Sequence, residues 1–423
     1  MTLIYDIIFI ILHLIYFPIF LFKRKLHKGF LSRLGFLPKE LTKLKDKDYI
    51  WIHAVSVGEA LVVSKLLDVL RKQLPDKKLL ISTVTPTGNK IARSLIKNQD
   101  IVIYFPLDLS LIVRKFVNRI NPCVFVTAET EIWPNIINYL HKRRIPIIII
   151  NGRISKRSFK GYRKIRYFLK GILNKISLFC MQTLDDAEKI IYLGADKDKV
   201  KVIGNLKFDE TFPSHSYQTT DLGLKKDDRL LIAGSTHSNE EEIIIRVYKN
   251  ILRDYPRLKL MIAPRHIDRV NSIIELIKAN NFKVIKFSKV KNEQLNLTAY
   301  SNYIFLVDTI GDLKTLYNLA TIVFVGGSLV NKGGHNIIEP GYFGKPIIFG
   351  PNMSNFQDMT DTFLSRKAAI QVKDEQGLQK NIKMLFDNNV RTQTISKNAK
   401  EVVEENRGAT ERTVNLLKEI LKF

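Results

Sequence analysis

The stretch YIWIHAVSVGEALVVSKLLDVLRKQL, residues 49–74, joins two contrasting patterns and decides the fold. Its first part, Tyr49–Val57, is a short apolar run that predicts a buried strand. Its second part, Glu59–Leu74, places apolar residues three and four positions apart and predicts an amphipathic helix. A buried strand that leads into such a helix is typical of a parallel sheet with helices on both faces.

The same alternation continues towards the C-terminus. Short apolar runs follow in KLLISTVT, IVIYFP, CVFVTAE and IPIIIIN, and the rhythm restarts near residue 229 with RLLIAGSTH, LKLMIAPRH, NYIFLVDTIGD, TIVFVGG and KPIIFGP. We therefore expect an α/β protein with two Rossmann-like domains, joined near Pro213–Asp221. Neither a P-loop nor a G-x-G-x-x-G pattern occurs, which argues against kinase-like and NAD-binding sites.

The N-terminal residues form an apolar stretch of about 20 residues, the length that crosses a bilayer core. KRKLHK, residues 23–28, follows it and would keep the rest of the chain on the cytoplasmic face. No small-residue cleavage site is visible, so residues 1–22 are predicted to be an uncleaved membrane anchor. Asp6, His13 and Pro18 interrupt the stretch, which leaves an interfacial helix or a buried helix as alternatives.

The formal net charge of +26 calls for a negatively charged partner: a nucleic acid, an anionic membrane or a phosphorylated substrate. Residues 132–184 contain no Asp or Glu but many Lys and Arg with interleaved aromatic residues. This basic stretch could lie on phosphate head groups or be a solvated helix, and the anchor favours the membrane. The two cysteines, Cys123 and Cys180, are far apart and suggest neither a disulfide framework nor a zinc site.

Polar residues follow several predicted strands of the first half, where ligands bind in open parallel sheets. Glu59 stands at the start of a helix, where the helix dipole favours the ionised carboxylate, and could take a proton from an attacking hydroxyl. Without context, an ordinary helix-start acid is the simpler interpretation. Glu129 and Glu131 follow another strand, and Lys207 in GNLKFD is a candidate for holding an anionic group.

The second half offers Ser235–His237, Arg265 with His266, and Asp308–Gly311 at its predicted strand ends. The stretch GGHNIIEP, Gly333–Pro340, then brings a glycine pair, an amide and a carboxylate. The glycines would let a ligand approach the backbone, and a helix starting near Asn336 would direct free N–H groups at a phosphate. Glu339 is suited to accept two ribose hydroxyls, and an ordinary left-handed turn with a capped helix is the alternative.

Taken together, the motifs resemble the bacterial 3-deoxy-D-manno-octulosonic acid (Kdo) transferases of lipopolysaccharide synthesis. The resemblance rests on HAVSVGE (53–59), TPTG (85–88), ETEIWPN (129–135), GNLKFD (204–209), APRH (263–266), DTIGDL (308–313) and GGHNIIEP (333–340). It implies a GT-B glycosyltransferase with two facing Rossmann-like domains. The implied parts are a membrane anchor (1–22), an acceptor-binding domain (23–212), a CMP-sugar-binding domain (213–395) and a C-terminal helix (396–423) that returns to the first domain.

The resemblance also implies a reaction: inverting transfer of Kdo from CMP-Kdo to a tetraacylated lipid A precursor, lipid IVA, at the inner membrane. Glu59 matches the general base, and Glu131 and Lys207 match positions that stabilise the transition state, although Glu129 is an alternative to Glu131. The implied CMP-binding residues are Arg265, His266, Thr309, Ile310, Gly311, Asn336, Ile337, Ile338 and Glu339.

We expect no cofactor, because the donor carries one phosphate and Arg265 with a helix end could stabilise it without a metal ion. We also expect no nucleic-acid partner. Two other hypotheses stay open. The protein could use another nucleotide sugar, or it could be a basic binding protein without activity, whose binding would depend steeply on salt.

Overall fold

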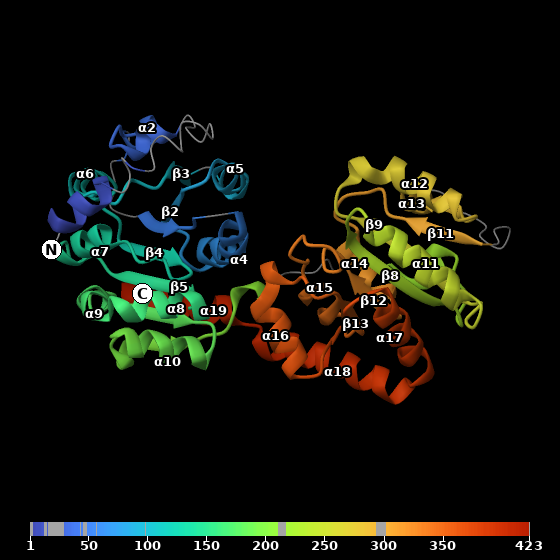
Figure 1. Ribbon diagram of the computed structural model, residues 1–423. Helices are drawn as coiled ribbons and strands as arrows, with labels where there is room; N and C mark the ends of the chain where they lie inside the picture. Colours follow the sequence, from blue (N-terminus) through green and yellow to red (C-terminus); the bar gives the residue numbers. More distant parts are fainter. Residues whose placement is uncertain are drawn as a thin grey trace. The chain divides into compact units, whose positions relative to one another are not determined.

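The computed structural model describes residues 3–11, 15, 29–42, 44, 49–55, 57–97, 99–209, 217–292 and 302–422. The chain divides into two compact units, Met1–Glu210 with Asn406–Phe423 and Thr211–Glu405 (Figure 1). Each unit contains one seven-stranded parallel sheet flanked by helices. The predicted join at 212–213 lies outside the described residues.

The sheet of the first unit has the strand order β3-β2-β1-β4-β5-β6-β7. Its strands are β1 (Tyr49–His53), β2 (Lys78–Thr83), β3 (Ile101–Tyr104), β4 (Val124–Ala128), β5 (Ile147–Gly152), β6 (Leu178–Met181) and β7 (Val200–Val202). Its helices are α2 (Phe30–Arg33), α3 (Lys39–Thr42), α4 (Val57–Gln73), α5 (Pro86–Leu95), α6 (Ser110–Ile120), α7 (Pro134–Lys142), α8 (Lys156–Lys164), α9 (Arg166–Leu173), α10 (Leu184–Leu193) and α19 (Ala409–Leu421).

The strand predicted over Tyr49–Val57 is shorter in the structure, because β1 ends at His53 and α4 begins at Val57. All five residues of β1 are buried, as expected for a central strand covered on both faces. His53 lies opposite Ser82 of β2 and Thr127 of β4. The carboxyl ends of these three strands therefore meet at one edge of the sheet.

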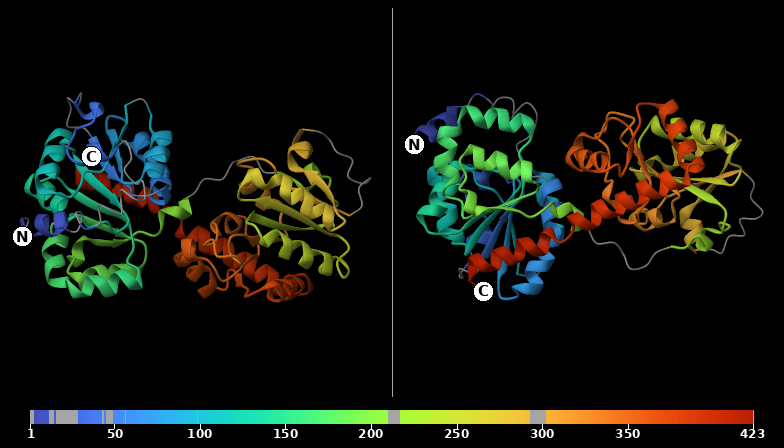
Figure 2. Two further views of the ribbon diagram at one scale, coloured as in Figure 1. Left: turned by 45° about the horizontal axis from the view of Figure 1, so that its top comes forward. Right: turned by 90° about the horizontal axis from the view of Figure 1, so that it is seen from below.

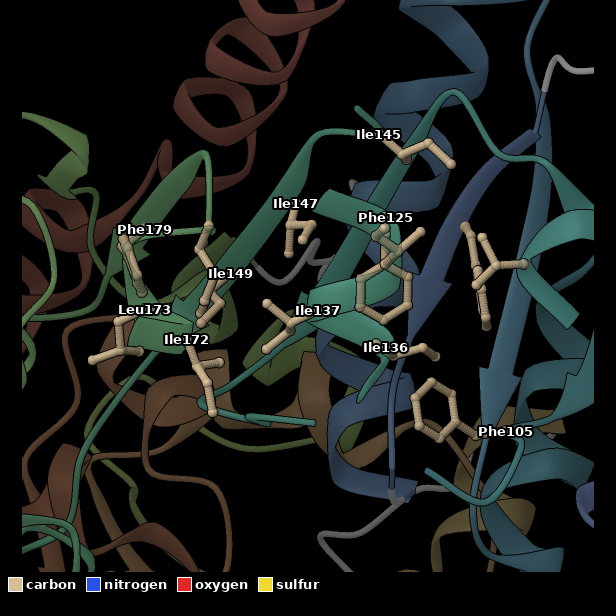
Figure 3. Packing of buried hydrophobic residues seen from close by; sticks show 14 of the residues in the cluster. Phe105, Phe125, Ile136, Ile137, Ile145, Ile147, Ile149, Ile172, Leu173 and Phe179 are labelled. Carbon is tan, nitrogen blue, oxygen red and sulfur yellow. The ribbon is translucent and has the colours of Figure 1, made fainter. Parts of the chain in front are cut away.

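An aromatic cluster packs beneath this edge (Figure 3). Phe125 meets Trp51 edge to face with ring centroids 4.9 Å apart, and His53 stacks on Phe105 at 3.7 Å. Ile136 and the rest of the apolar face of α7 close the cluster. Because fully buried, interdigitated side chains tolerate little displacement, the cluster gives the strand ends a rigid base.

The sheet of the second unit has the strand order β10-β11-β9-β8-β12-β13-β14. Its strands are β8 (Arg229–Thr236), β9 (Leu258–Pro264), β10 (Lys283–Lys286), β11 (Tyr303–Leu306), β12 (Ile322–Val325), β13 (Ile347–Phe349) and β14 (Ile370–Gln371). Its helices are α11 (Glu240–Leu252), α12 (Val270–Ala279), α13 (Phe287–Asn292), α14 (Leu313–Leu316), α15 (Ile338–Tyr342), α16 (Gln357–Ser365), α17 (Glu375–Asp387) and α18 (Asn389–Asn406), the last residue of α18 falling in the first unit.

The C-terminal helix of the first unit is α19, which packs against α4 (Figure 2). The segment predicted for this role, residues 396–423, also includes the second half of α18. That half belongs to the second unit up to Glu405, because its apolar face, including Val403 beside Gly341, is buried there. Gly408, with φ at 85°, separates the two helices, and Asp209 accepts hydrogen bonds from the backbone N–H groups of Gly408 and Thr410.

The predicted anchor, residues 1–22, lies partly outside the described residues, which include 3–11 and 15 of this segment. In the portion of the chain that the structure describes, no helix is both long enough and apolar enough to cross a bilayer. The helical residues 3–11 contact the first unit through Asp6. Its carboxylate accepts hydrogen bonds from the Ser110 N–H at 3.2 Å and from the Asn135 amide at 2.6 Å.

Candidate active site

Glu59 occupies the first turn of α4, directly beyond the end of β1. Its side chain is buried, and its Oε2 accepts a hydrogen bond of 2.8 Å from the backbone N–H of Val55. The α4 helix has 17 residues, and its dipole favours negative charge at this end. The carboxylate is therefore held in one place by the strand-to-helix turn of the opening stretch.

Glu131 lies beyond the end of β4, the strand beside β1. Burial, together with repulsion from the carboxylates of Glu59 and Glu129, raises the pKa of Glu131 from 4.5 to about 7. Glu131 therefore keeps its proton to a higher pH than an ordinary carboxyl group does. The arrangement is suited to proton transfer at this edge.

Glu129 is engaged in a different way. Its φ of 57° places it in the left-handed region, and its Oε2 lies 3.2 Å from the Nε of Arg153. A carboxylate paired with a guanidinium is a weaker candidate for proton chemistry than one with a raised pKa. This contrast favours Glu131 over Glu129 for the role that the sequence left open between them.

Lys207 belongs to a short 3-10 helix, Leu206–Asp209, that packs against α4. Asn205 Oδ1 accepts the Lys207 N–H at 3.0 Å, and Asn151 Oδ1 accepts the Leu206 N–H at 3.0 Å. Asn205 also donates to Gln182 Oε1 at 2.9 Å. This amide network fixes the turn that carries Lys207.

Asp108 holds the other side of the Glu131 segment. Its carboxylate accepts the backbone N–H groups of Asn135 at 3.0 Å and Ile136 at 2.9 Å, at the start of α7. The Asn135 amide donates to the backbone oxygen of Asp108 at 2.7 Å and to Asp6 Oδ1 at 2.6 Å. No sequence motif singles out Asp108, since its role depends on a contact between distant turns.

In the second unit, the predicted donor residues follow three different strands. Arg265 and His266, both exposed, follow β9, and Thr309–Gly311 follow β11. Ile310 is 88% exposed, and Gly311 has a φ of 94°, which a residue with a side chain would adopt only with strain. Arg265, His266 and Ile310 are thus accessible from solvent at the carboxyl edge of the sheet, whereas the Thr309 hydroxyl is buried.

The glycine pair in GGHNIIEP has a packing reason. Gly333 and Gly334 have φ values of 84° and 71°, and a Cβ on Gly334 would lie 2.2 Å from Met353 Sδ. The helix expected from Asn336 begins at Ile338 as α15 and has only five residues. Such a short helix has little dipole to offer a phosphate, so α15 does not provide the helix-start phosphate site expected near Asn336.

The remaining residues of this motif divide into two groups. The side chains of Ile337 and Ile338 are fully buried, so only their backbone could face a ligand. Asn336 Oδ1 accepts the Ile338 N–H at 3.0 Å, and Glu339 Oε1 lies 3.7 Å from Lys314 Nζ. Asn336 and Glu339 are half-buried and keep polar atoms at the strand ends.

Glu240 organises this edge, although no sequence motif singles it out. It is fully buried, and its two carboxylate oxygens accept backbone N–H groups from His237, Gly327, Ser328 and Leu329 at 2.7 to 3.0 Å. It therefore ties the turn after β8 to the turn after β12. The only local signal was an acidic run, Glu240–Glu242, at the start of a predicted helix.

Two parallel α/β units with polar strand ends are the architecture of the GT-B fold. In a comparison of folds, UDP-GlcNAc 2-epimerase from Neisseria meningitidis aligns with 88% of this chain and 100% of its own, with a TM-score of 0.58 and 11% identity. At that identity the likeness shows the fold alone.

Sequence comparisons show the family. Residues 28–210 match the family model for 3-deoxy-D-manno-octulosonic-acid transferase (kdotransferase). The 3-deoxy-D-manno-octulosonic acid transferase of Haemophilus influenzae is 34% identical over 88% of this chain and 87% of its own. A bifunctional glycosyltransferase/methyltransferase of Fusobacterium nucleatum is 39% identical over 86% of this chain, which spans 56% of that relative. The chain belongs to the Kdo transferase family and is a glycosyltransferase.

Proposed function

We propose that the protein transfers Kdo from CMP-Kdo to a tetraacylated lipid A precursor, lipid IVA, in lipopolysaccharide synthesis, with inversion at the anomeric carbon. The observation that carries the proposal is the pair of interacting carboxylates, Glu59 and Glu131, at the ends of adjacent strands. In this step the acceptor oxygen forms a bond to the anomeric carbon, and the bond from that carbon to the phosphate oxygen breaks. CMP leaves with the electron pair of the broken bond.

Glu59 is the proposed base that takes the proton from the acceptor hydroxyl. Its fixed position after β1 keeps the carboxylate aimed in one direction, and a hydroxyl that attacks an oxocarbenium-like centre needs a base of only modest strength. Burial, and then repulsion from its carboxylate neighbours, raises the pKa of Glu131 to about 7, so a protonated Glu131 adds no negative charge beside Glu59. Lys207 is proposed to stabilise negative charge on an anionic substrate group or on the leaving phosphate.

The donor is proposed to bind the strand ends of the second unit. Arg265 and His266 would contact its anionic groups, Glu339 would accept the ribose hydroxyls, and Thr309–Gly311 would line the nucleotide. The positive charge needed by a single phosphate comes from side chains in this scheme, so the proposed step uses no metal ion and no cofactor.

The acceptor is a lipid, and we propose that the first unit works at the cytoplasmic face of the inner membrane. Two groups of exposed residues support this. Large apolar side chains are exposed in the N-terminal segment and beside Ser110, which bonds to Asp6: Leu3, Ile4, Ile7, Ile8, Ile10, Ile11, Ile15, Leu31, Phe36 and Leu111. Asp6 of the N-terminal helix accepts hydrogen bonds from the first unit. We therefore favour a helix that lies in the membrane interface, with its apolar face in the lipid, over one that spans the membrane.

The basic stretch supplies the second group. In α8 and α9 the residues Lys156, Arg157, Lys160, Arg163, Lys164, Arg166 and Lys170 are exposed, and Tyr167 between them is 97% exposed. Exposed cations around an exposed tyrosine are suited to anionic head groups, where each cation near the surface contributes about 1 kcal/mol. No nucleic-acid partner is proposed.

Transfer of radiolabelled Kdo tests the proposal. CMP-Kdo is generated enzymatically and incubated with lipid IVA and membranes that contain wild type, Glu59→Gln, or the control Glu188→Gln, an exposed acid on α10. We expect labelled lipid with wild type and the control and none with Glu59→Gln, and separation by size counts the sugars added. A folded wild type without transfer contradicts the substrate pair, and inhibition by UDP rather than CMP points to another nucleotide sugar.

A further inference from the structure

Three histidines converge on the donor edge of the second unit, and each follows a different strand. His266 follows β9, His237 follows β8, and His335 follows β12 after the glycine pair. These strands are neighbours in the sheet, in the order β9-β8-β12. Of the three, only His266 has a role in the proposed function so far.

His237 and His335 form a direct pair. Their Nε2 atoms lie 2.9 Å apart, and their rings are parallel within 4° with centroids 5.1 Å apart. Gly327 lies against both rings, because a Cβ there would come within 3.1 Å of His335 and 3.4 Å of His237. The ring of His266 meets that of His237 edge to face at 5.6 Å.

A hydrogen bond between two imidazole nitrogens limits the charge of the pair. One Nε2 must carry the hydrogen and the other must offer its lone pair. The pair can therefore be neutral or carry one added proton, but two added protons would put two N–H groups against each other. A pair of this kind titrates as one unit.

The surroundings keep the pair neutral when no ligand is bound. Burial, followed by the charges of Arg265, His237 and His266, lowers the pKa of His335 to about 4. Burial, followed by His266, Lys332 and Arg269, also lowers the pKa of His237, and only Glu241 opposes this.

The acids beside the pair are already engaged. Glu241 is bound by Arg269 at 2.7 and 3.1 Å, and Glu240 accepts four backbone N–H groups. Within the described ranges, no carboxylate forms an ion pair with His237, His266 or His335. The pair thus lies in a positive field whose negative counterpart must come from a ligand.

We infer that His237 and His335 form a subsite for an oxyanion of the donor, and that the pair takes up one proton from solvent when that oxyanion binds. The inference rests on the proposed function, because CMP-Kdo supplies two oxyanions, a phosphate and a carboxylate. Either one would offset the repulsion from Arg265 and Lys332 and turn the neutral pair into a cationic hydrogen-bond donor.

The sign of the pH dependence follows from this linkage. A ligand that raises the pKa of a group binds more tightly as the pH falls through the pKa of the complex, and the gain levels off below the pKa of the free protein. Between those two values, the donor affinity of wild type should fall about tenfold for each unit of rising pH.

Calorimetric titration of the full chain tests the subsite. CMP and free Kdo are titrated separately into wild type, His335→Gln and His237→Gln between pH 6 and 8, in two buffers of different ionisation enthalpy. His141→Gln, an exposed histidine on α7, is the control. Since the phosphate of CMP itself titrates, the quantity of interest is the difference in proton uptake between wild type and variant with the same ligand.

We expect wild type and the control to take up close to one proton more than either glutamine variant with at least one ligand. Uptake with CMP assigns the subsite to the phosphate, and uptake with Kdo assigns it to the carboxylate. Equal proton counts in all proteins with both ligands would overturn the inference and leave the donor site standing. Failure of folded wild type to bind CMP would remove the proposed donor site itself.

Ring ¹⁵N NMR on wild type alone gives a second readout, in case the glutamine variants do not fold. The free protein should show His237 and His335 as a neutral pair, and the ligand-bound protein should show one cationic ring. Two rings that stay neutral at saturating CMP and at saturating Kdo would overturn the inference as well.

Discussion

The two sheets share one architecture, but their carboxyl edges carry opposite chemistry. At the edge of the first unit, acids lie close together, and burial raises the pKa of Glu131 to about 7 and that of Asp108 to about 6. At the edge of the second unit, bases lie among cations, and burial lowers the pKa of His335 to about 4. The edge of the first unit therefore favours protonated carboxyl groups, and the edge of the second unit favours neutral histidines.

In both units the sheet topology determines where a site can form, and the residues of the turns determine its charge. Both sheets are parallel, so both direct their strand ends to one side, where turns are free to vary without disturbing the core. An acid edge suits the removal of a proton from a neutral hydroxyl. A basic edge suits an anionic donor and its leaving group, which is the division of labour that the proposed transfer requires.

The largest expected effect comes from the acid edge. Glu59→Gln keeps the size of the side chain and its contact with the Val55 N–H, but removes the base. We expect kcat for Kdo transfer to fall by about 10²- to 10⁴-fold, the range for loss of a positioned general base. The affinity for CMP, measured by calorimetry, should stay unchanged.

If Glu59→Gln lowered the CMP affinity while kcat held, the assignment of the two edges would be wrong. Glu188→Gln, an exposed acid of the same unit, serves as the control and should match wild type in both measurements.

The sequence predicted the two α/β units because their strands are buried on both faces and read as unbroken apolar runs. It singled out Glu59, Glu131 and Arg265 as candidates because each lies shortly after such a run, whereas Lys207 was selected from the motif GNLKFD. It did not predict Asp108, Glu240 or the pairing of His237 with His335, since each depends on contacts between turns of different strands. The segment expected to return to the first domain from 396 does so from Asn406, because the buried residues of α18 up to Val403 pack in the second unit.

The second prediction concerns the basic edge. Arg265 is exposed, and among the described residues no carboxylate pairs with it, so its charge is available to a ligand. Arg265→Ala should weaken CMP binding by about 10- to 100-fold, the loss of a charge-assisted hydrogen bond to phosphate. Arg265→Lys should recover part of that loss, because it keeps the charge without the bidentate fork.

Calorimetry measures this affinity, and Arg253→Ala, at the C-terminal end of α11, is the matched control. A CMP affinity that did not change in Arg265→Ala would separate this arginine from the nucleotide and place the donor elsewhere.

The third prediction uses the pH dependence of stability at the acid edge. The pKa of Glu131 is raised to about 7 in the folded protein, so the folded state binds the proton more tightly than the unfolded state. This acid stabilises the fold fully below about pH 4.5, and the contribution is lost as the pH rises towards 7, at a cost of about 2 to 3 kcal/mol. Glu131→Gln is neutral at every pH and escapes that loss.

Thermal unfolding checks the sign. The Tm of Glu131→Gln should match that of wild type at pH 4.5 and exceed it at pH 8 by several degrees, at about 2 to 4 °C for each kcal/mol. Glu131→Gln less stable than wild type at pH 8 would mean that the ionised carboxylate has a favourable partner, which contradicts the raised pKa.

The smallest expected change in activity and stability concerns the N-terminal helix, whose Asp6 is hydrogen-bonded to Ser110 and Asn135 of the first unit. Asp6→Ala removes the acceptor for the Ser110 N–H and for the Asn135 amide, so Asn135, four residues beyond Glu131, loses one of its two side-chain contacts. Since each such bond contributes about 1 kcal/mol, we expect a Tm lower by a few degrees and kcat lower by about two- to fivefold. Asp76→Ala, an exposed acid in the turn before β2, is the control.

Two measurements separate the possible explanations for a loss of activity in Asp6→Ala: the amount of protein in the membrane fraction, and kcat in detergent micelles. If the helix acts only as an anchor, the variant should leave the membrane fraction and regain full kcat in detergent micelles that contain lipid IVA. If Asp6 also positions the Glu131 segment, kcat stays low in micelles while CMP affinity is unchanged. The contacts of Asp6 with the turns after β3 and β4 favour the second outcome, in which the helix belongs to the catalytic unit as well as to the lipid surface.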